Sequence, residues 1–186
     1  RRQRQMCIRD SHIPMFDNMY AKRLKAYKQI GYELACGLQI GKQTVNAIYD
    51  WDNYSTYYHK DLLGANNNII ISSPVISGPK VYELINLLKE KQMSGVQITI
   101  VTWAPDSYRF GDAAYWMQLH EDMRQAGFYI KTVEESCERF AVIDQEVVWY
   151  GNINLLAKDK VDDSIMRVMS KEIASELMEI TFGDNG

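Results

Sequence analysis

Hydrophobic residues follow two different patterns along the chain, and the change falls near residue 66. Over residues 18–39, and again after a cap expected at Asp52 or Asn53, apolar residues recur at steps of three and four. This spacing puts them on one face of a helix, so the sequence predicts two amphipathic helices. Their apolar and aromatic positions include Tyr20, Leu24, Tyr27, Ile30, Leu34, Tyr54, Tyr57, Tyr58 and Leu62.

Both helices are open to a second interpretation. Basic residues on the first would suit an acidic partner or nucleic acid, and tyrosines on the second would suit base stacking. The favoured interpretation is that the apolar stripes pack on a core while the charged faces are solvated. His59, Lys60 and Asp61 are consecutive, so on a helix they cannot face one phosphate together.

From residue 66, short β-branched runs alternate with helical patterns, which indicates an α/β domain with a mixed β-sheet flanked by helices. The strands are continuous apolar runs, as expected when both faces of a sheet are covered. Gly95 and Gly127 are expected to end helices, and Ser170 to cap the last one. The predicted strands are 68–74, 96–105, 128–136, a hairpin at 139–152 turning at 144–146, and 162–169; the predicted helices are 80–95, 113–127 and 170–183.

Residues 1–11 (RRQRQMCIRDS) have no apolar period and resemble the translation of a sequencing adapter, so we expect a non-native leader. Removing its four arginines and one aspartate leaves 17 basic and 23 acidic residues, a net charge of −6. This balance disfavours extensive DNA binding but is compatible with a small phosphate site. The expected organisation is a helical segment at 12–65, linking to an upstream domain, and an α/β domain at 66–183.

The cysteines and the hydropathy of the chain argue against a disulfide-rich, a zinc-binding or a membrane-spanning protein. Cys36 and Cys137 lie far apart without metal-ligand spacing around them, so neither a disulfide framework nor a zinc site is expected. No apolar run approaches the roughly 20 residues that span a bilayer, and there is no signal-peptide pattern. We therefore expect a cytoplasmic protein with no membrane partner.

One stretch carries the candidate chemistry, with six residues at a characteristic spacing. They are Cys137, Arg139, Asp144, Gly151, Asn152 and Asn154. This spacing, together with the order of elements over residues 66–183, resembles one half of the phospholipase D superfamily, whose signature is H-x-K, four residues, D, and later G-S-x-N. The resemblance implies a phosphodiester site without metal or other cofactor, in which His attacks phosphorus and Lys and Asn hold the phosphate oxygens. It also implies that two halves form one site, and hence a homodimer.

Residues 137–183 resemble more specifically the C-terminal phospholipase D-like domain of bacterial helicase-type ATPases, and residues 20–34 resemble the segment that precedes it. The resemblance implies packing on an upstream ATPase domain. The chain itself contains no G-x-x-x-x-G-K-[ST] motif, so ATP hydrolysis is not assigned to it.

Cys137 stands at the position of the attacking His and has two candidate roles. As a nucleophile it would need Arg139 to stabilise its thiolate, because a free thiol with a pKa of about 8.5 is mostly protonated at neutral pH. As a half-buried apolar residue it would fill the space of the lost imidazole. The second role is favoured, because Glu134, Glu135 and Glu138 would raise the thiol pKa and repel a phosphodiester.

Arg139 and Asp144 are likewise open to two roles. The guanidinium of Arg139 can hold phosphate oxygens with two parallel hydrogen bonds, or it can form an ion pair with Asp144, Glu138 or Glu146. Asp144 would orient the imidazole in the family, but without a His it also suits a hairpin turn.

Asn152 replaces the Ser of the signature and Asn154 matches its Asn. Their amides can donate hydrogen bonds to a phosphate or bond locally after the glycine. The sharp turn VTWAPDSYRFG at residues 101–111 adds Trp103, Tyr108 and Arg109, which can stack on a base beside the site or anchor the loop.

Three functions follow from these residues. The favoured hypothesis is a non-catalytic domain of a nucleic-acid-processing protein, acting in phosphate or nucleic-acid binding or in dimerisation. The alternatives are a metal-independent phosphodiesterase or nuclease that uses Cys137, and a purely structural docking domain.

Overall fold

The computed structural model describes residues 33–34, 46–108, 112–134, 137–157 and 163–183. The chain divides into two compact units, Arg1–Ala47 and Ile48–Gly186. The first predicted helix, residues 18–39, lies outside the described residues except for Glu33–Leu34, which form strand β1 and correct the prediction there. Gly31, a poor helix former, comes shortly before this strand.

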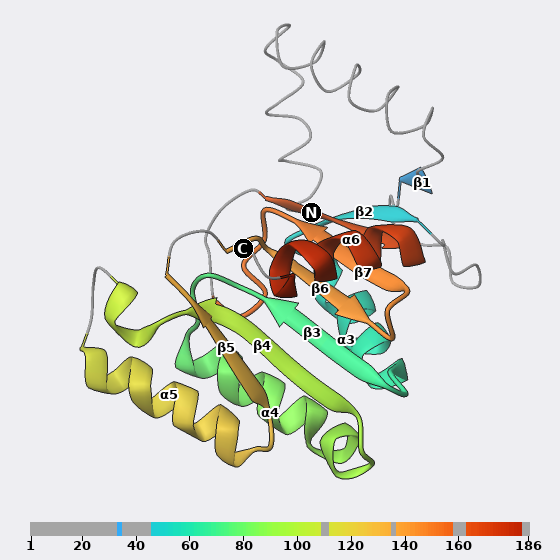
Figure 1. The fold of residues 1–186 in the computed structure, drawn as a ribbon. Helices are drawn as coiled ribbons and strands as arrows, with labels where there is room; N and C mark the ends of the chain where they lie inside the picture. The colour runs from blue at the N-terminus through green and yellow to red at the C-terminus, as the bar shows by residue number, and fades with distance from the viewer. Residues whose placement is uncertain (1–32, 35–45, 109–111, 135–136, 158–162, 184–186) are drawn as a thin grey trace, which may run out of the picture. The chain divides into compact units, whose positions relative to one another are not determined.

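The described strands that follow are β2 (Ala47–Asp50), β3 (Asn68–Ser72), β4 (Gln97–Trp103), β5 (Tyr129–Val133), β6 (Phe140–Ile143), β7 (Val147–Gly151) and β8 (Ser164–Met169). They form a mixed sheet in the order β2-β8-β7-β6-β3-β4-β5 (Figure 1). β3, β4 and β5 run parallel, while β6 is antiparallel to β3, β7 to β6, and β8 to β7. The predicted mixed α/β fold is confirmed, although the sequence predicts no strand at β2.

The described helices of this unit are α3 (Tyr54–Gly64), α4 (Gly78–Met93), the 3₁₀ turn η1 (Pro105–Ser107), α5 (Ala113–Gln125) and α6 (Lys171–Phe182). Asn53 precedes α3 as expected, but its side chain makes no capping hydrogen bond. Ser170 does cap α6, because its Oγ accepts from the Ile173 backbone N–H at 3.2 Å. Within the described part of the chain, no helix combines the length and apolar character needed to cross a membrane.

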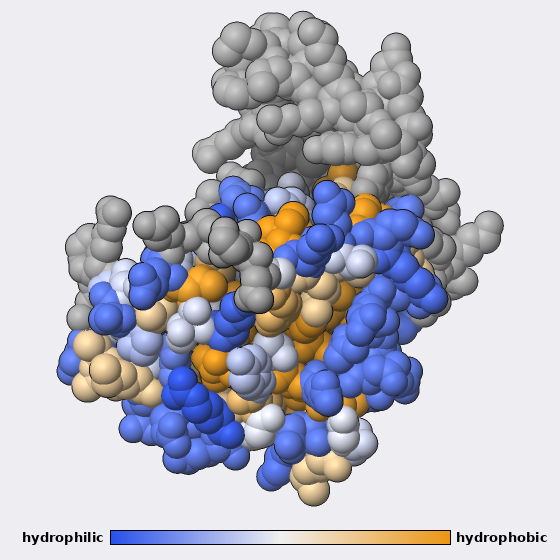
Figure 2. All heavy atoms as spheres, viewed as in Figure 1, coloured by the Kyte–Doolittle hydropathy of each residue, from blue (hydrophilic) through white to orange (hydrophobic). Residues whose placement is uncertain are grey.

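Helices cover both faces of the sheet, with α6 on one face and α4 and α5 on the other (Figure 1). On the α6 side, Ala174 and Leu177 pack against alternate strand residues such as Ile70 and Val142. The intervening residues, including Ile71, are also buried, which explains why the strands are continuous apolar runs. Figure 2 shows the α6 face, where apolar residues gather near the centre and hydrophilic residues surround them.

Backbone conformation explains where the predicted turns fall. Gly95 and Gly127, which follow α4 and α5, have φ angles of +94° and +84°. A side chain would strain the backbone in this left-handed region, so both helices end at glycine as predicted. Asp144 and Gln145 adopt φ angles of 51° and 55° in the turn between β6 and β7. Two such residues match the twist of a tight hairpin.

An ion pair beside an aromatic cluster holds α3 to the sheet. Asp61 accepts hydrogen bonds from Arg167 Nε at 2.6 Å and Nη2 at 3.0 Å, and from Trp149 Nε1 at 2.8 Å. The side chains of Arg167 and Asp61 are only 13% and 15% exposed. The Trp149 ring centroid also lies 5.5 Å from that of Tyr58 and 5.1 Å from that of Tyr49. Charge pairing and ring packing therefore act at the same contact.

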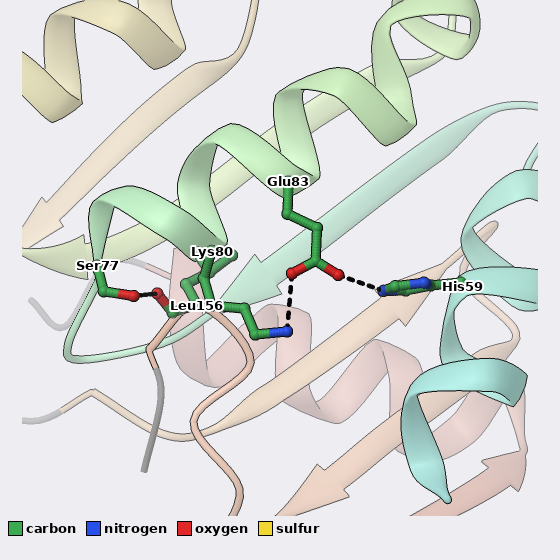
Figure 3. A network of polar contacts seen from close by, with 5 residues as sticks. All are labelled: His59, Ser77, Lys80, Glu83 and Leu156. Atoms are coloured by element: carbon green, nitrogen blue, oxygen red, sulfur yellow. Dashed lines mark hydrogen bonds and ion pairs between the residues drawn. The ribbon is translucent and has the colours of Figure 1, made fainter.

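A second set of polar contacts joins α3 to α4 (Figure 3). His59 Nε2 lies 3.6 Å from Glu83 Oε1, and Lys80 Nζ lies 2.9 Å from Glu83 Oε2. His59 thus contacts α4 while Asp61 contacts β7 and β8, so the consecutive His, Lys and Asp of α3 do not form one site. Burial lowers the pKa of His59, although Glu83 acts in the opposite direction.

We expect Asp61→Ala to lower the free energy of unfolding by about 3 kcal/mol, because it removes a carboxylate from a largely desolvated ion pair. Urea denaturation followed by circular dichroism measures this change. Glu90→Gln on the exposed face of α4 is the control and should change stability by less than about 0.5 kcal/mol. Equal effects of the two substitutions would show that the Asp61 contacts do not hold α3.

His120 on α5 is a buried titratable group, with only 1% of its surface exposed. Neither ring nitrogen has a hydrogen-bond partner among the described residues. Burial lowers the pKa of His120 below its usual 6.5, and the positive charge of Arg124 lowers it further. The folded state therefore favours the neutral ring.

Because the pKa of His120 is lower in the folded state, the neutral ring contributes stability that is present above pH 6.5 and is lost as the pH falls through the lowered pKa. The free energy of unfolding should decrease from about pH 7.5 to about pH 5.5, by at most about 1.4 kcal/mol per pH unit from this group. His120→Leu should remove most of the decrease, and His59→Gln should remove less, because His59 is partly exposed. An unchanged pH dependence in His120→Leu would rule out this role.

Candidate functional site

The candidate site lies at one edge of the sheet, where distant segments meet. β3, β4 and β7 end at this edge, and β6 begins there because it runs antiparallel to β3 and β7. Residues 137–139, before β6, therefore lie beside residues 151–152, at the end of β7. They share an open pocket of about 430 Å³. Its lining residues are Pro74, Trp103, Cys137, Glu138, Arg139, Tyr150, Gly151 and Asn152.

Cys137 borders this pocket but its sulfur contacts the sheet. Sγ lies 3.4 Å from Ser72 Oγ and 3.8 Å from the Val101 carbonyl oxygen, and the side chain packs against the core under α6. Burial raises the pKa of the Cys137 thiol and Glu138 also raises it, while Ser72 and Arg139 act in the opposite direction without cancelling the shift. A protonated, half-buried thiol is a weak nucleophile, so the geometry matches the apolar role of Cys137 better than the nucleophilic one.

Arg139 contributes the positive charge of the pocket. Its Nη1 donates to Asn152 Oδ1 at 2.8 Å and to the Asn152 carbonyl oxygen at 3.2 Å. Its Nε is buried and has no hydrogen-bond partner among the described residues. Within that part of the chain no carboxylate forms an ion pair with Arg139, so the expected pairing with Glu138, Asp144 or Glu146 is absent there.

Asn152 holds Arg139 in place. Its Nδ2 donates to Asp163 Oδ1 at 2.9 Å, which orients Oδ1 of the same amide toward the guanidinium. Gly151 allows β8 to approach, because a Cβ there would lie 2.6 Å from the Ser164 carbonyl oxygen. The expected donation from the Asn152 amide to a phosphate is thus replaced, for at least one N–H, by a bond to Asp163.

Asn154 does not line the pocket. It is only 2% exposed, and its Oδ1 accepts a hydrogen bond from Ser73 Oγ at 3.1 Å. Ser73 also accepts from the Leu156 backbone N–H at 3.4 Å, so these groups tie the loop after β7 to the end of β3. The expectation that Asn154 donates directly to a phosphate does not match this placement, whereas the local hydrogen-bonding role does.

Asp144 lies at the opposite end of β6 from Cys137. Its carboxylate accepts hydrogen bonds from the backbone N–H groups of Asn66, Asn67 and Asn68, at 2.8, 2.7 and 3.1 Å. Burial raises the pKa of Asp144, but these hydrogen bonds together with the positive charge of Lys91 outweigh it, so the net shift is downward. The hairpin-turn role matches this placement, whereas the role of orienting the residue at position 137 does not, because β6 lies between the two residues.

The end of β4 and the loop after it contribute aromatic residues with two different roles. Trp103 lines the pocket. Tyr108 instead packs inside the loop, stacked on Trp116 with ring centroids 4.3 Å apart, and its hydroxyl lies 3.0 Å from Thr102 Oγ1. The base-stacking position thus remains open to Trp103, Tyr108 is a loop anchor, and Arg109 falls outside the described residues.

Glu138 and Tyr150 form a part of the pocket wall that the signature spacing does not predict. Tyr150 Oη donates to Glu138 Oε2 at 3.0 Å, and this hydrogen bond, more than burial, raises the pKa of Tyr150. Tyr150 pairs with Phe140 across the hairpin. That register follows from the predicted turn at residues 144–146 and would have placed Tyr150 on the same face of the hairpin as Glu138, two residues before Phe140.

The pocket can bind an anion but lacks the nucleophile of the family signature. Arg139 supplies a cation that carboxylates of the described residues do not neutralise. None of the described histidines lines the pocket, because His59 lies on α3 and His120 on α5. The other polar side chains of the pocket are the Cys137 thiol, the Asn152 amide that bonds to Arg139, and Tyr150 with the Glu138 carboxylate that it bonds to.

Comparison with known proteins gives the family. A family model described as "Cardiolipin synthase, PLD-like domain" matches residues 58–181, whereas no curated protein matches the chain. Nuc from Salmonella typhimurium, described as a phospholipase D family member, is similar in structure with a TM-score of 0.57 at 14% identity, covering 73% of this chain and 91% of that one. NucT from Helicobacter pylori has a TM-score of 0.55 at 10% identity, with the same coverage of 73% and 91%.

A third similar structure is TrmBL2, described as an archaeal chromatin protein with a novel mode of DNA binding. Its TM-score is 0.50 at 10% identity, covering 96% of this chain and 64% of that one. At such identities the solved structures show the fold alone, but the family model matches well over half of the chain. The chain therefore belongs to the family of phospholipase D-like (PLD-like) domains.

Proposed function

We propose that this PLD-like domain binds a phosphodiester of nucleic acid in the pocket at the sheet edge and does not cleave it. The observation that carries the proposal is the state of Arg139. Its guanidinium borders an open pocket, is held by Asn152, and forms no ion pair with a carboxylate of the described residues. A guanidinium in this state is suited to charge-assisted hydrogen bonds with phosphate oxygens.

Cleavage by the chemistry of the family would need an attacking group and an acid. Cys137 is a poor attacking group, because burial and Glu138 keep its pKa raised. In the superfamily the acid that protonates the leaving group is the His of a second half, and none of the described histidines lines this pocket. The pocket therefore supports binding without catalysis.

Nucleic acid is the phosphodiester that one of the similar structures supports. A protein of similar fold is described as a chromatin protein that binds DNA, and Nuc belongs to the same superfamily. The acidic balance of the chain, −3 overall, limits the contact to few phosphates. Binding is therefore expected to be weak and local, with a shallow dependence on salt.

By the same proposal the domain works in the cytoplasm beside a helicase-type ATPase or as a homodimer. The similarity of residues 137–183 to the C-terminal domains of such ATPases supports the first partner, and the pairing of halves in the superfamily supports the second. Either partner would supply phosphate contacts that a single acidic domain lacks.

Arg139→Ala is expected to weaken binding of a fluorescein-labelled single-stranded DNA by about tenfold at low salt, since hydrogen bonds to charged groups contribute about 1.5–3 kcal/mol. Fluorescence anisotropy measures the dissociation constants. Arg124→Ala is the matched control, because Arg124 is a half-exposed arginine on α5 that does not line the pocket. It should change the dissociation constant by less than about twofold.

If Arg139→Ala and Arg124→Ala weaken binding equally, the contact is a non-specific charge effect and the pocket is not the site. If the unaltered protein binds no DNA, the structural docking function replaces the proposed one.

Cys137→Ala is expected to leave DNA affinity within about twofold of that of the unaltered protein, because the sulfur contacts the sheet and not the ligand. Neither protein should hydrolyse bis(p-nitrophenyl) phosphate in the presence of a chelator. Metal-independent hydrolysis that Cys137→Ala abolishes would overturn the non-catalytic assignment and support the phosphodiesterase alternative.

A further inference from the structure

The geometry points to a single-stranded nucleotide unit as the occupant of the pocket, with its phosphodiester on Arg139 and the adjacent base stacked on the indole of Trp103. This inference rests on the proposed function and adds the class of ligand to it. Trp103 ends β4, whereas Arg139 immediately precedes β6, yet both line the same pocket. An aromatic face beside a cation is the arrangement with which proteins bind single strands.

The Trp103 ring is held by its neighbours before any ligand arrives. Tyr108 contacts it edge-on, with ring centroids 6.0 Å apart and an interplanar angle of 69°. Tyr108 is fixed in turn by stacking on Trp116 and by the contact of its hydroxyl with Thr102. A ring ordered in this way costs little entropy when a base stacks on it.

The apolar walls and the volume of the pocket suit a nucleotide unit better than inorganic phosphate. Pro74 and Tyr150 add flat, largely apolar walls, and Tyr150 is 37% exposed. The volume of about 430 Å³ falls within the range of roughly 300–1,000 Å³ that is usual for small-molecule sites. Inorganic phosphate would leave these walls without contacts, whereas a nucleotide unit would use them.

Glu138 favours an internal linkage over a terminal phosphate. Its carboxylate lies in the same pocket as Arg139 and would repel a dianion more strongly than a singly charged phosphodiester. In a duplex the bases are already stacked and paired, so stacking on Trp103 would require their separation. An internal nucleotide of a single strand has both a singly charged phosphodiester and an unpaired base, so it is the occupant that fits this pocket.

The test is a double-mutant cycle between the protein and the DNA, measured by fluorescence anisotropy. A labelled oligo-dT and the same strand with abasic sites are bound to the unaltered protein and to Trp103→Leu, Trp103→Phe and Arg139→Ala. We expect the unaltered protein to bind oligo-dT about tenfold more tightly than the abasic strand, a difference within the usual range for one base stacked on an aromatic ring. Trp103→Leu should bind both strands equally, and Trp103→Phe should recover part of the difference.

Two controls separate stacking from loss of the fold. Trp51→Leu removes an indole that contacts Tyr54 away from the pocket, so it should keep the preference for oligo-dT. Thermal unfolding of each variant shows whether it is folded; Trp103→Phe keeps an aromatic ring and decides the outcome if Trp103→Leu is unfolded.

The outcomes distinguish this inference from the proposed function. Arg139→Ala could weaken binding of both strands while the unaltered protein binds oligo-dT and the abasic strand equally. In that case the phosphate site stands and the stacking role of Trp103 is wrong. If Arg139→Ala weakens neither strand, the proposed function fails as well. Equal affinity for duplex and single strand, or binding to phosphatidylglycerol vesicles in place of DNA, would also overturn the inference.

Discussion

The register of β6 against β3 determines the candidate site, and Asp144 fixes it from the far end of the strand. The backbone N–H groups of Asn66 and Asn67, just before β3, and of Asn68, its first residue, donate to the Asp144 carboxylate, so β6 cannot slide without breaking these bonds. A slip by one residue would turn every side chain of β6 to the other face. The residues before β6, Cys137 and Arg139, are positioned by this constraint although they lie at the opposite edge.

This constraint explains how the Asp of the signature spacing can matter without touching the other signature residues. Asp144 stabilises a turn with two positive φ angles, a conformation that is costly for most residues, and it satisfies backbone donors of β3 at the same time. Its effect on the site is transmitted through the ladder between β3 and β6. None of these hydrogen bonds of Asp144 involves the residue at position 137.

Two other signature positions are also substituted: Arg139 stands in place of Lys and keeps its positive charge, and Asn152 stands in place of Ser. Arg139 retains the cation of the signature Lys and adds a planar group whose N–H donors have fixed directions. Asn152 in place of Ser supplies an oxygen that accepts from Arg139 and an N–H that donates to Asp163. The result is an arginine fixed by a hydrogen-bond chain, with no ion pair to a carboxylate of the described residues.

The elements from β3 to α6 could be predicted from the sequence because local signals agree there: β-branched runs, glycines at helix ends, and Ser170 as a cap. β2 could not, because its four residues depend on pairing with distant β8 more than on local preference. The signature spacing predicted that Asn152 and Asn154 both reach the site. It could not predict which of the two lines the pocket, because the direction of each side chain depends on how the loop after Gly151 packs. The sequence likewise could not predict that Trp103 lines the pocket while Tyr108 anchors the loop, because only tertiary contacts distinguish the two residues.

Binding and catalysis place different demands on a second copy of this domain. In the superfamily that the sequence resembles, the acid that protonates the leaving group comes from a second half, so cleavage requires two sites to meet. A phosphodiester on Arg139 and a base on Trp103 require only the residues around one pocket. Because Glu138 lines the pocket, a partner that adds further carboxylates there would increase the repulsion of a bound phosphate. A partner would therefore strengthen binding most effectively by contacting neighbouring nucleotides, beside this pocket rather than over it.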